Sequence, residues 1–210
     1  QEVNTQWNAM KGCLGDQQGF YTCYDATDAQ AKQTVWDVRK HSLGILLGMK
    51  GDAKPLPFIE DACIPVEHLS EYVSRILDFC RQHDRPVALY AHASAGVIHI
   101  RPILNLKQQE DVDLLRAISA KSFEMVCEYG GSWSGEHGDG LVRSYKNREF
   151  FGEQLYQAFR EVKQNFDPAG IMNPGKIIDG QDIAENLRIH PDYHTHVPTS
   201  HFHFRKEQGL

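Results

Sequence analysis

The sequence has no apolar run of the length, about 18 residues, that a membrane-spanning helix requires. It also lacks the pattern of a secretory signal peptide. We therefore expect no transmembrane segment. Positive charge is scarce as well, since 22 Lys and Arg stand against 28 Asp and Glu, for a formal net charge of −6. A nucleic-acid partner requires a basic face, so we expect no such partner.

Cysteine is sparse, and the five that are present form no CxxC pair. A scattered, odd-numbered set is typical of reduced, buried thiols rather than of a disulfide framework, which indicates a cytoplasmic protein. The spacing of iron–sulfur ligands is missing, and so is a glycine-rich loop of the GxGxxG kind. The chain itself is therefore expected to hold neither a cluster nor a nucleotide.

The sequence is nevertheless long enough to form a core. Its 210 residues, of which 41% are hydrophobic, suit one large domain. Apolar residues at helical spacing predict helices at 27–47, 66–83, 110–129 and 150–165. The first is opened by a capping box at Thr27 and should carry Ala31, Val35, Val38 and Leu46 on its inner face. Strands are predicted at 19–24, 58–64, 86–91 and 97–102, with a turn and short strand at 171–177.

This order of elements predicts an α+β fold of two layers, with helices packed on a mainly antiparallel sheet. The strands on either side of Gly96 read as a hairpin. We expect the chain to be a fragment of a longer protein, with the domain covering residues 1–179 and residues 180–210 forming an extended tail toward a following module. The tail carries histidines at positions 190, 194, 196, 201 and 203. It could bind a metal adventitiously, or it is a solvated linker.

Two glycine-punctuated stretches carry the residues that suggest chemistry. They are YAHASAGVIHIR at 90–101 and GGSWSGEHGDGLVR at 130–143. Glycine allows positive φ and close approach of the backbone to a ligand. His92 and His99 could face each other across the hairpin, and Glu136 could complete a His2Glu set, a ligand type common for catalytic zinc.

His137 follows Glu136 directly, and the irregular glycine backbone could turn it toward the same site. An imidazole with an unperturbed pKa of about 6.5 suits proton removal at neutral pH, which makes His137 a candidate general base. The residues alone leave the alternative that each histidine is an ordinary core or surface side chain. The role of Arg39, one turn after Trp36 on the first predicted helix, is left open in the same way, since a solvated charge fits its position.

A family resemblance extends this interpretation. GSWSGEHGDGLVR, followed by FDPAGIMNPGKI at 166–177, resembles the C-terminal domain of FAD-linked oxidases. This group contains D-lactate, glycolate and D-2-hydroxyglutarate dehydrogenases of the vanillyl-alcohol-oxidase type. WDVR at 36–39 and FIED at 58–61 resemble the same pattern, so the likeness covers roughly residues 20–178. The strings HASAG and HIRP, together with the tail, look most like those of large bacterial fusion proteins that add iron–sulfur modules after this domain.

The resemblance implies that His92, His99 and Glu136 hold a divalent metal, zinc by preference, which grips the carboxylate and hydroxyl of a D-2-hydroxyacid. His137 would take the hydroxyl proton while hydride passes to FAD. In this group FAD is held mainly by a separate N-terminal domain, so the isolated chain is expected to be inactive. The full protein is expected in the cytoplasm, or peripheral to the inner membrane face through its electron acceptor.

The resemblance also implies contacts to the substrate carboxylate. Arg39 and Lys54 fall where members of the group place cationic contacts, and a guanidinium can bind a carboxylate with two hydrogen bonds. The commonest pattern of the group, HxGDGNxHxN, is replaced here by HASAGVIHIR, with Arg101 where an asparagine is usual. Arg101 is either an added carboxylate contact or a salt-bridged strand residue.

Two functions of other classes remain open. A zinc hydrolase would use Glu136 or His137 to activate a metal-bound water, and it would turn over without flavin. A non-catalytic cap or docking module would bind no metal and would tolerate the substitution His92→Ala.

Overall fold

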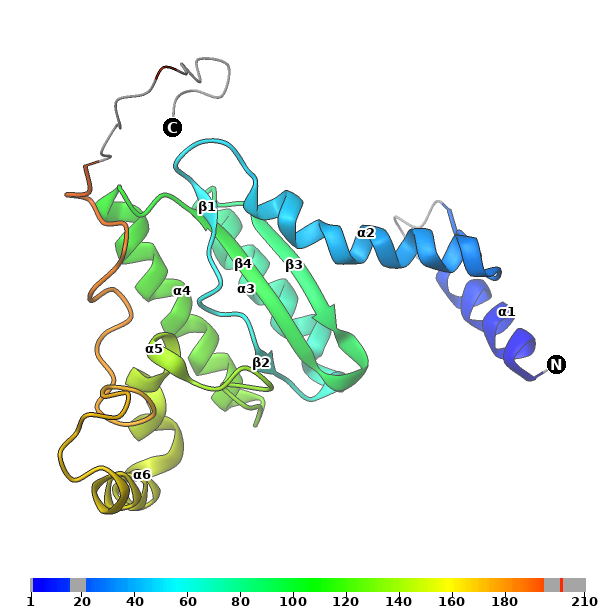
Figure 1. Cartoon of the computed structure of the whole chain (residues 1–210). Helices are drawn as coiled ribbons and strands as arrows, with labels where there is room; N and C mark the ends of the chain where they lie inside the picture. Colours follow the sequence, from blue (N-terminus) through cyan, green and yellow to red (C-terminus); the bar gives the residue numbers. More distant parts are fainter. Residues whose placement is uncertain (1, 16–21, 195–200, 202–210) are drawn as a thin grey trace. The chain divides into compact units, whose positions relative to one another are not determined.

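The computed structural model describes residues 2–15, 22–194 and 201 and divides into two compact units, Gln1–Gly48 and Met49–Leu210 (Figure 1). The first unit contains two helices, α1 (Glu2–Gly15) and α2 (Ala29–Leu47). Their connection is fastened by Asp25, whose carboxylate accepts hydrogen bonds from Trp7 Nε1 at 3.1 Å and Lys11 Nζ at 2.9 Å. The strand predicted at 19–24 is wrong for residues 22–24, which are irregular, and residues 19–21 lie outside the described part.

Helix α2 ends where the periodicity predicts but begins differently. Its N-cap is Asp28, not Thr27, because the Asp28 carboxylate accepts the N–H of Ala31 at 2.8 Å. Ala31 is buried, whereas Val35 and Val38, expected on the same inner face, are 48% and 68% exposed. The first unit therefore leaves the apolar stripe of α2 largely uncovered by its own residues.

The second unit is organised around strand β4 (Val97–Leu104). Strand β3 (Val87–His92) pairs antiparallel with it along one edge, from Val87↔Pro102 to His92↔Val97, which is the predicted hairpin. Strands β1 (Lys54–Pro55) and β2 (Ala62–Cys63) pair antiparallel with opposite ends of its other edge (Figure 1). The prediction of a mainly antiparallel sheet in an α+β fold is confirmed.

The hairpin turn depends on Gly96, which has φ +73°. A Cβ at this position would lie 2.1 Å from the carbonyl oxygen of Ile64, and the Ile64 N–H donates to the Gly96 carbonyl at 2.9 Å. The turn is thus pressed against the chain that leaves β2. Glycine is required here by both the backbone angle and the available space.

Two helices, α3 (Leu69–Gln82) and α4 (Gln109–Glu128), form the second layer against the sheet (Figure 1). Their boundaries agree with the predicted helices, except that Val66–His68 forms a 3₁₀ turn ahead of α3. The core joins side chains of α3, α4 and β4, among them Tyr72, Ile76, Cys80, Leu115, Ile118, Val126, Ile98, Ile100 and Leu104.

Successive side chains of a strand point to opposite faces, and β4 uses both faces. Ile98, Ile100 and Leu104 belong to the core on the helix side. His99 and Arg101, between them in sequence, therefore lie on the face that does not carry the helices. The sheet thus separates a packed face from a polar one.

The strand predicted at 58–64 is wrong over most of its length, because the ladder contains just Ala62–Cys63. Asp61 interrupts it with a left-handed φ of +87°. Residues 60–61 form a turn instead of a strand. That turn brings two acidic side chains, Glu60 and Asp61, beneath the glycine-rich segment described below.

The C-terminal part contains α5 (Gly140–Arg143), a 3₁₀ turn at Ser144–Lys146 and α6 (Asn147–Phe166), which is kinked at Gly152. The short strand predicted within 171–177 does not form. Backbone N–H groups of this segment bond to a side chain instead of a strand partner: the Asp167 carboxylate accepts those of Ile171 and Met172 at 3.0 and 2.8 Å. This segment is a loop tied to the end of α6.

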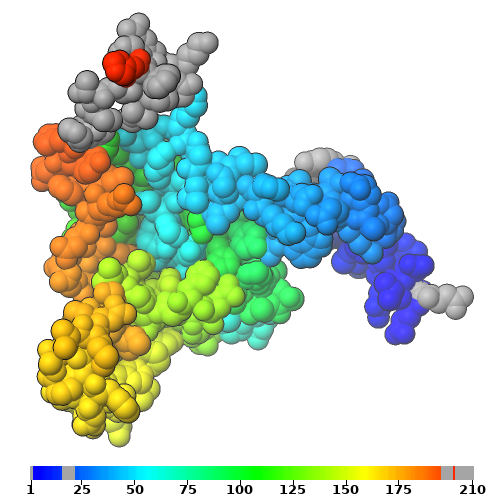
Figure 2. Space-filling model, viewed as in Figure 1, coloured from blue at the N-terminus to red at the C-terminus, as the bar shows by residue number. Residues whose placement is uncertain are grey.

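The segment after residue 179 is not simply an extended tail. Ile183 is buried in the core, and Asp182 pairs with Arg116 of α4 at 2.8 Å. Figure 2 shows this segment in orange on the outside of the second unit. The part up to residue 194 thus includes residues packed on the domain, while His196 and His203 lie outside the described residues.

Candidate metal centre and its supporting loop

The hairpin places two imidazoles side by side. His92 is the last residue of β3 and pairs with Val97, while His99 pairs with Tyr90 in the middle of the ladder. The two imidazole rings are 5.2 Å apart between centroids, and the Tyr90 ring contacts both of them. The seven-residue separation in sequence is therefore closed by the turn.

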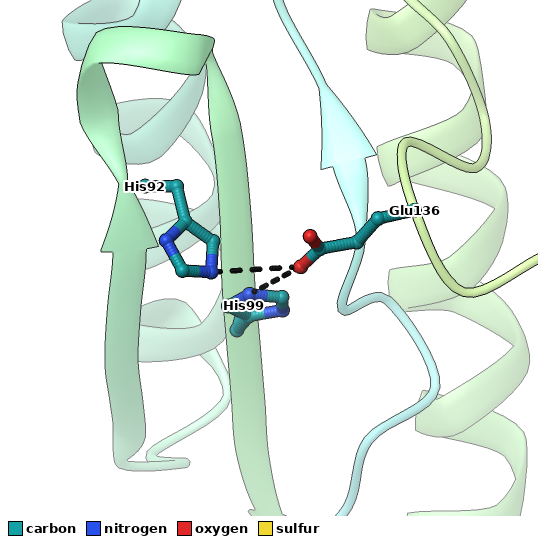
Figure 3. Close-up of side chains that lie close together, drawn as sticks. All are labelled: His92, His99 and Glu136. Atoms are coloured by element: carbon teal, nitrogen blue, oxygen red, sulfur yellow. Dashed lines mark ion pairs between the residues drawn. The ribbon is translucent and has the colours of Figure 1, made fainter.

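Glu136 reaches this pair from the glycine-rich loop between α4 and α5 (Figure 3). Its Oε1 lies 3.5 Å from His92 Nε2 and 3.3 Å from His99 Nε2. His137 approaches the same oxygen, with Nε2 at 3.6 Å. Three imidazole nitrogens thus surround one carboxylate oxygen.

These separations are informative about what the cluster can bind. A hydrogen bond between nitrogen and oxygen is about 2.7–3.2 Å long, so the imidazole–carboxylate contacts are longer than good hydrogen bonds. Two ligand atoms placed about 2.0–2.1 Å from a tetrahedral zinc are about 3.3–3.4 Å apart. The distances of His92 and His99 from Glu136 are close to this value, and the donor set of two imidazoles and one carboxylate is chemically suitable for a metal.

The cluster is enclosed at the middle strand, β4, and accessible at its other two residues. The His99 side chain is 7% exposed, whereas those of His92 and Glu136 are 39% and 46% exposed. Burial lowers the pKa of His99, and the neighbouring imidazoles act in the same direction, while the carboxylates of Glu60 and Glu136 oppose them. The lowered pKa favours the neutral imidazole, which is the form that binds metals.

His137 lies on the same side of the loop as Glu136. Its ring stacks on that of His99, with centroids 5.2 Å apart and planes inclined by 15°. The side chain is 42% exposed, and its Nδ1 lies 3.8 Å from Glu60 Oε1. A substrate bound at the open side of the cluster would therefore find an accessible imidazole beside it.

The loop that carries these residues is fastened to Asp61. The fully buried Asp61 carboxylate accepts the Ser134 hydroxyl at 2.6 Å and the backbone N–H groups of Gly135, Glu136 and His137 at 3.1, 2.9 and 2.9 Å. Burial alone raises the pKa of Asp61, but these hydrogen bonds outweigh it and hold the pKa below its usual value. The carboxylate is therefore ionised where it meets the loop.

Buried Arg143 supports the loop from the other end. Its guanidinium donates to the carbonyl of Gly138, at 3.1 Å from Nε and 2.6 Å from Nη2, and to the carbonyl of Glu60 at 2.9 Å. Asp139 accepts Asn147 Nδ2 at 2.8 Å. Arg143 thus connects the loop to the turn at residues 60–61, and Asp139 connects it to the first residue of α6.

Two of the cationic residues predicted to contact substrate, Arg101 and Lys54, belong to the same unit as the cluster and have partners of their own. Arg101 lies two residues beyond His99 on the same face of β4, but its Nη2 is 2.6 Å from Glu60 Oε2, so it is a salt-bridged strand residue in this structure. Lys54 pairs with Leu104 and donates to the Met49 carbonyl. Five residues of strand separate Leu104 from His99, or about 17 Å.

Arg39 belongs to the first unit. Its guanidinium lies 5.6 Å from the centroid of the Trp36 ring, which is the neighbour expected from helical spacing. Its role toward a substrate stays a prediction.

Sequence reasoning overlooked Glu60, Asp61 and Tyr90 as parts of the site. The string FIED at 58–61 resembles the family pattern, but the sequence predicts a continuous strand through it. A strand would place the two acidic side chains on opposite faces. The signal that could have identified them is the pair of adjacent acids inside an otherwise apolar stretch. A buried carboxylate needs hydrogen-bond donors, and the glycine-rich loop supplies them.

Residues 2–177 match the sequence profile of the FAD linked oxidases, C-terminal domain. The chain belongs to this family. The match spans both compact units, and it includes every residue of the cluster and its supporting loop. Over the described residues, we find no helix with the length and apolar character needed to cross a membrane.

Curated relatives agree with this assignment. The chain is 38% identical over 169 residues to the D-2-hydroxyglutarate dehydrogenase of Haemophilus influenzae, covering 80% of this chain and 16% of that protein. It is 39% identical over 159 residues to the enzyme of the same name from Escherichia coli, covering 76% and 15%. A D-lactate dehydrogenase of Archaeoglobus fulgidus is 30% identical over 160 residues, with 76% and 34% covered. The chain thus spans about a sixth of the first two relatives.

Proposed function

We propose that this chain is the substrate-binding domain of a flavin-dependent dehydrogenase that oxidises a D-2-hydroxyacid to the 2-oxoacid. The observation that carries the proposal is the convergence of three imidazoles on one oxygen of Glu136, at 3.3–3.6 Å, on the open side of a buried strand. The relatives named as D-2-hydroxyglutarate dehydrogenases support this class of reaction.

In this proposal His92, His99 and Glu136 are the protein ligands of a divalent metal, zinc by preference. When bound, the metal would polarise the substrate oxygens and FAD would accept the hydride. His137 takes the proton of the substrate hydroxyl, as its accessible ring beside the cluster allows. Burial of His99 keeps water from one side of the site.

The substrate carboxylates are assigned to cationic residues as further parts of the proposal. Arg39 and Lys54 keep the roles implied by the family resemblance. Arg101 is held by Glu60, so a substrate carboxylate would reach it by sharing or replacing that partner. A dicarboxylic hydroxyacid is the substrate class with a second carboxylate to offer.

The remaining parts of the proposal concern the longer protein. FAD would be bound mainly by an N-terminal domain, and iron–sulfur modules would follow this chain and pass on the electrons. The 210-residue chain alone is then inactive. A cytoplasmic location, with peripheral association at the inner membrane face through the electron acceptor, is proposed on the same basis.

The proposal is tested by zinc binding to the purified chain and by turnover of its flavin-bearing parent. We expect about one zinc per chain, and an affinity at least about 100-fold lower in Glu136→Gln, because the substitution removes an anionic ligand. In the parent protein, His137→Ala should abolish oxidation of D-2-hydroxyacids while zinc content is retained.

His68→Ala is the matched control, since the His68 ring stacks on Tyr129 and belongs to neither group of candidate ligands, so its loss should change neither zinc binding nor turnover. Zinc bound equally by the wild-type chain and Glu136→Gln would contradict the ligand assignment. Hydrolytic turnover without flavin would instead favour a zinc hydrolase.

A further inference from the structure

Asp61 is a buried acidic side chain that the proposed reaction does not use. Its four hydrogen bonds come from one short segment, residues 134–137, and three of them are donated by consecutive backbone N–H groups. Consecutive N–H groups that converge in this way form an anion-binding nest. Here the anion is a side chain of the protein itself, so the conformation of the loop is tied to the position of Asp61.

The backbone of Asp61 is fixed in turn to the strand that carries His99. Its N–H donates to the carbonyl of Ile98 at 2.9 Å, and its carbonyl accepts the N–H of Gly135 at 2.8 Å. Ile98 is the residue directly before His99. Asp61 is therefore a short link between the strand that supplies one imidazole and the loop that supplies Glu136.

Two groups of side chains in the described residues have the composition and spacing of metal ligands. One is His92, His99 and Glu136, and the other is Asp61, Glu136 and His137. Three of the donors to Asp61, from Ser134, Gly135 and His137, meet Oδ2, while the N–H of Glu136 meets Oδ1. Asp61 is thus already engaged by the loop through both of its oxygens, which favours a supporting role over that of a metal ligand.

The backbone of Asp61 also has the character of a functional position. A non-glycine residue with φ +87° is in a sparsely populated region, and such residues persist where the surroundings over-determine them. The surroundings here are the hydrogen bonds to Ile98 and to the loop. They turn the carboxylate toward residues 134–137, which a continuous strand would not do.

We propose that Asp61 is the positioning residue of this site, holding residues 134–137 so that Glu136 meets His92 and His99 and His137 lies beside them. The proposal rests on the metal site of the proposed function, but it concerns a different residue. It predicts one metal per chain, held by the first group alone.

The test replaces the carboxylate without changing its size. In Asp61→Asn an amide NH2 takes the place of one oxygen and faces N–H donors, so the loop loses at least one of its attachments. We expect the zinc dissociation constant of the 210-residue chain to rise by about 10- to 100-fold, as for other residues that orient metal ligands. Hydrogen exchange at the amides of Glu136 and His137 should accelerate.

Asp167→Asn provides a matched control within the same unit. Asp167 is also buried, and it also accepts two backbone N–H groups of a glycine-containing loop, those of Ile171 and Met172. This variant should lose a comparable support while its zinc affinity stays within about threefold of wild type. A general loss of stability would weaken zinc binding in both variants alike and would overturn the proposal.

Ser134→Ala covers the case in which Asp61→Asn does not fold. It removes one donor to Asp61 and should raise the zinc dissociation constant by a smaller factor, with faster exchange at the amide of His137. Unchanged exchange in both variants that fold would also overturn the proposal. Should the wild-type chain and its parent bind no zinc, the proposed metal site fails, yet the exchange measurement still decides whether Asp61 holds the loop.

Discussion

The two faces of β4 differ in almost every respect although they alternate residue by residue. On one face Ile98, Ile100 and Leu104 are enclosed by helices. On the other, His99 is nearly as buried, at 6% exposed, but it meets imidazoles and carboxylates instead of apolar side chains. Burial by itself therefore does not distinguish core from site. The difference lies in the partners that each buried group has.

The comparison explains how the protein keeps a polar site on a small sheet. The helix face gains stability from apolar burial, whereas the other face has buried groups that need hydrogen bonds or ion pairs. Asp61 and Arg101 are each matched, the first by loop donors and the second by Glu60.

The largest effect is expected on the helix face. Ile100→Ala should lower the free energy of unfolding by about 2–5 kcal/mol, because Ile100 is fully buried and a cavity would remain. Leu89→Ala is the control, since Leu89 pairs with Ile100 on the edge strand but is 47% exposed. Urea denaturation of the whole chain measures both. Equal losses would mean that the centre and the edge of this face are packed alike.

A somewhat smaller effect is expected from the ion pair on the other face. Arg101→Met leaves the Glu60 carboxylate without its partner at 2.6 Å and should cost about 3 kcal/mol of unfolding free energy. The double variant Arg101→Met/Glu60→Gln should recover most of that loss. A double-mutant cycle from urea denaturation gives the coupling. Strict additivity would show that the pair is not coupled and that Arg101 is held otherwise.

The smallest effect is expected at a polar pair within the core. Tyr72 contacts Ser122 Oγ at 2.7 Å, and Tyr72→Phe should cost about 1 kcal/mol at pH 7. Burial raises the pKa of Tyr72 to about 12, above the value of about 10 for an exposed tyrosine.

The folded chain therefore holds this proton more tightly than the unfolded chain does. The corresponding stability is present below about pH 10 and is lost as the pH rises toward 12. Urea denaturation at several alkaline pH values should show a steeper loss for the wild type than for Tyr72→Phe. Tyr193→Phe, at a 38% exposed residue, should follow the wild type, and parallel curves for all three would contradict the assignment.

Much of the second unit could be predicted from local patterns. The hairpin and helices α3 and α4 follow from periodicity and turn residues, because their apolar side chains are buried against close neighbours in the sequence and the sheet. The prediction of a strand at 58–64 was wrong because the conformation of Asp61 depends on hydrogen bonds to a loop more than 70 residues away in the sequence. The short strand predicted within 171–177 was wrong for the same kind of reason, since the Asp167 side chain accepts the N–H groups that a strand partner would have accepted.

The residue types of the site could be predicted, but the contacts that hold those residues in place could not. His92, His99 and Glu136 were identified by residue type and spacing, and the structure brings them together. The supporting residues could not be identified in that way, because Glu60 and Asp61 act through contacts with Arg101 and with backbone N–H groups. The first unit contains an error of another kind. Helical spacing predicted that Val35 and Val38 lie on the inner face of α2, but residues of their own unit do not cover them.

The close approach at Gly96 has a consequence for how this domain can diverge. Every amino acid other than glycine carries a Cβ, and at this position that atom would overlap the carbonyl oxygen of Ile64 at 2.1 Å. No substitution, however conservative, leaves the two backbones where they are. We therefore expect saturation mutagenesis to return glycine alone at position 96. Among distant relatives, this one residue would mark the hairpin even where the flanking sequence has drifted beyond recognition.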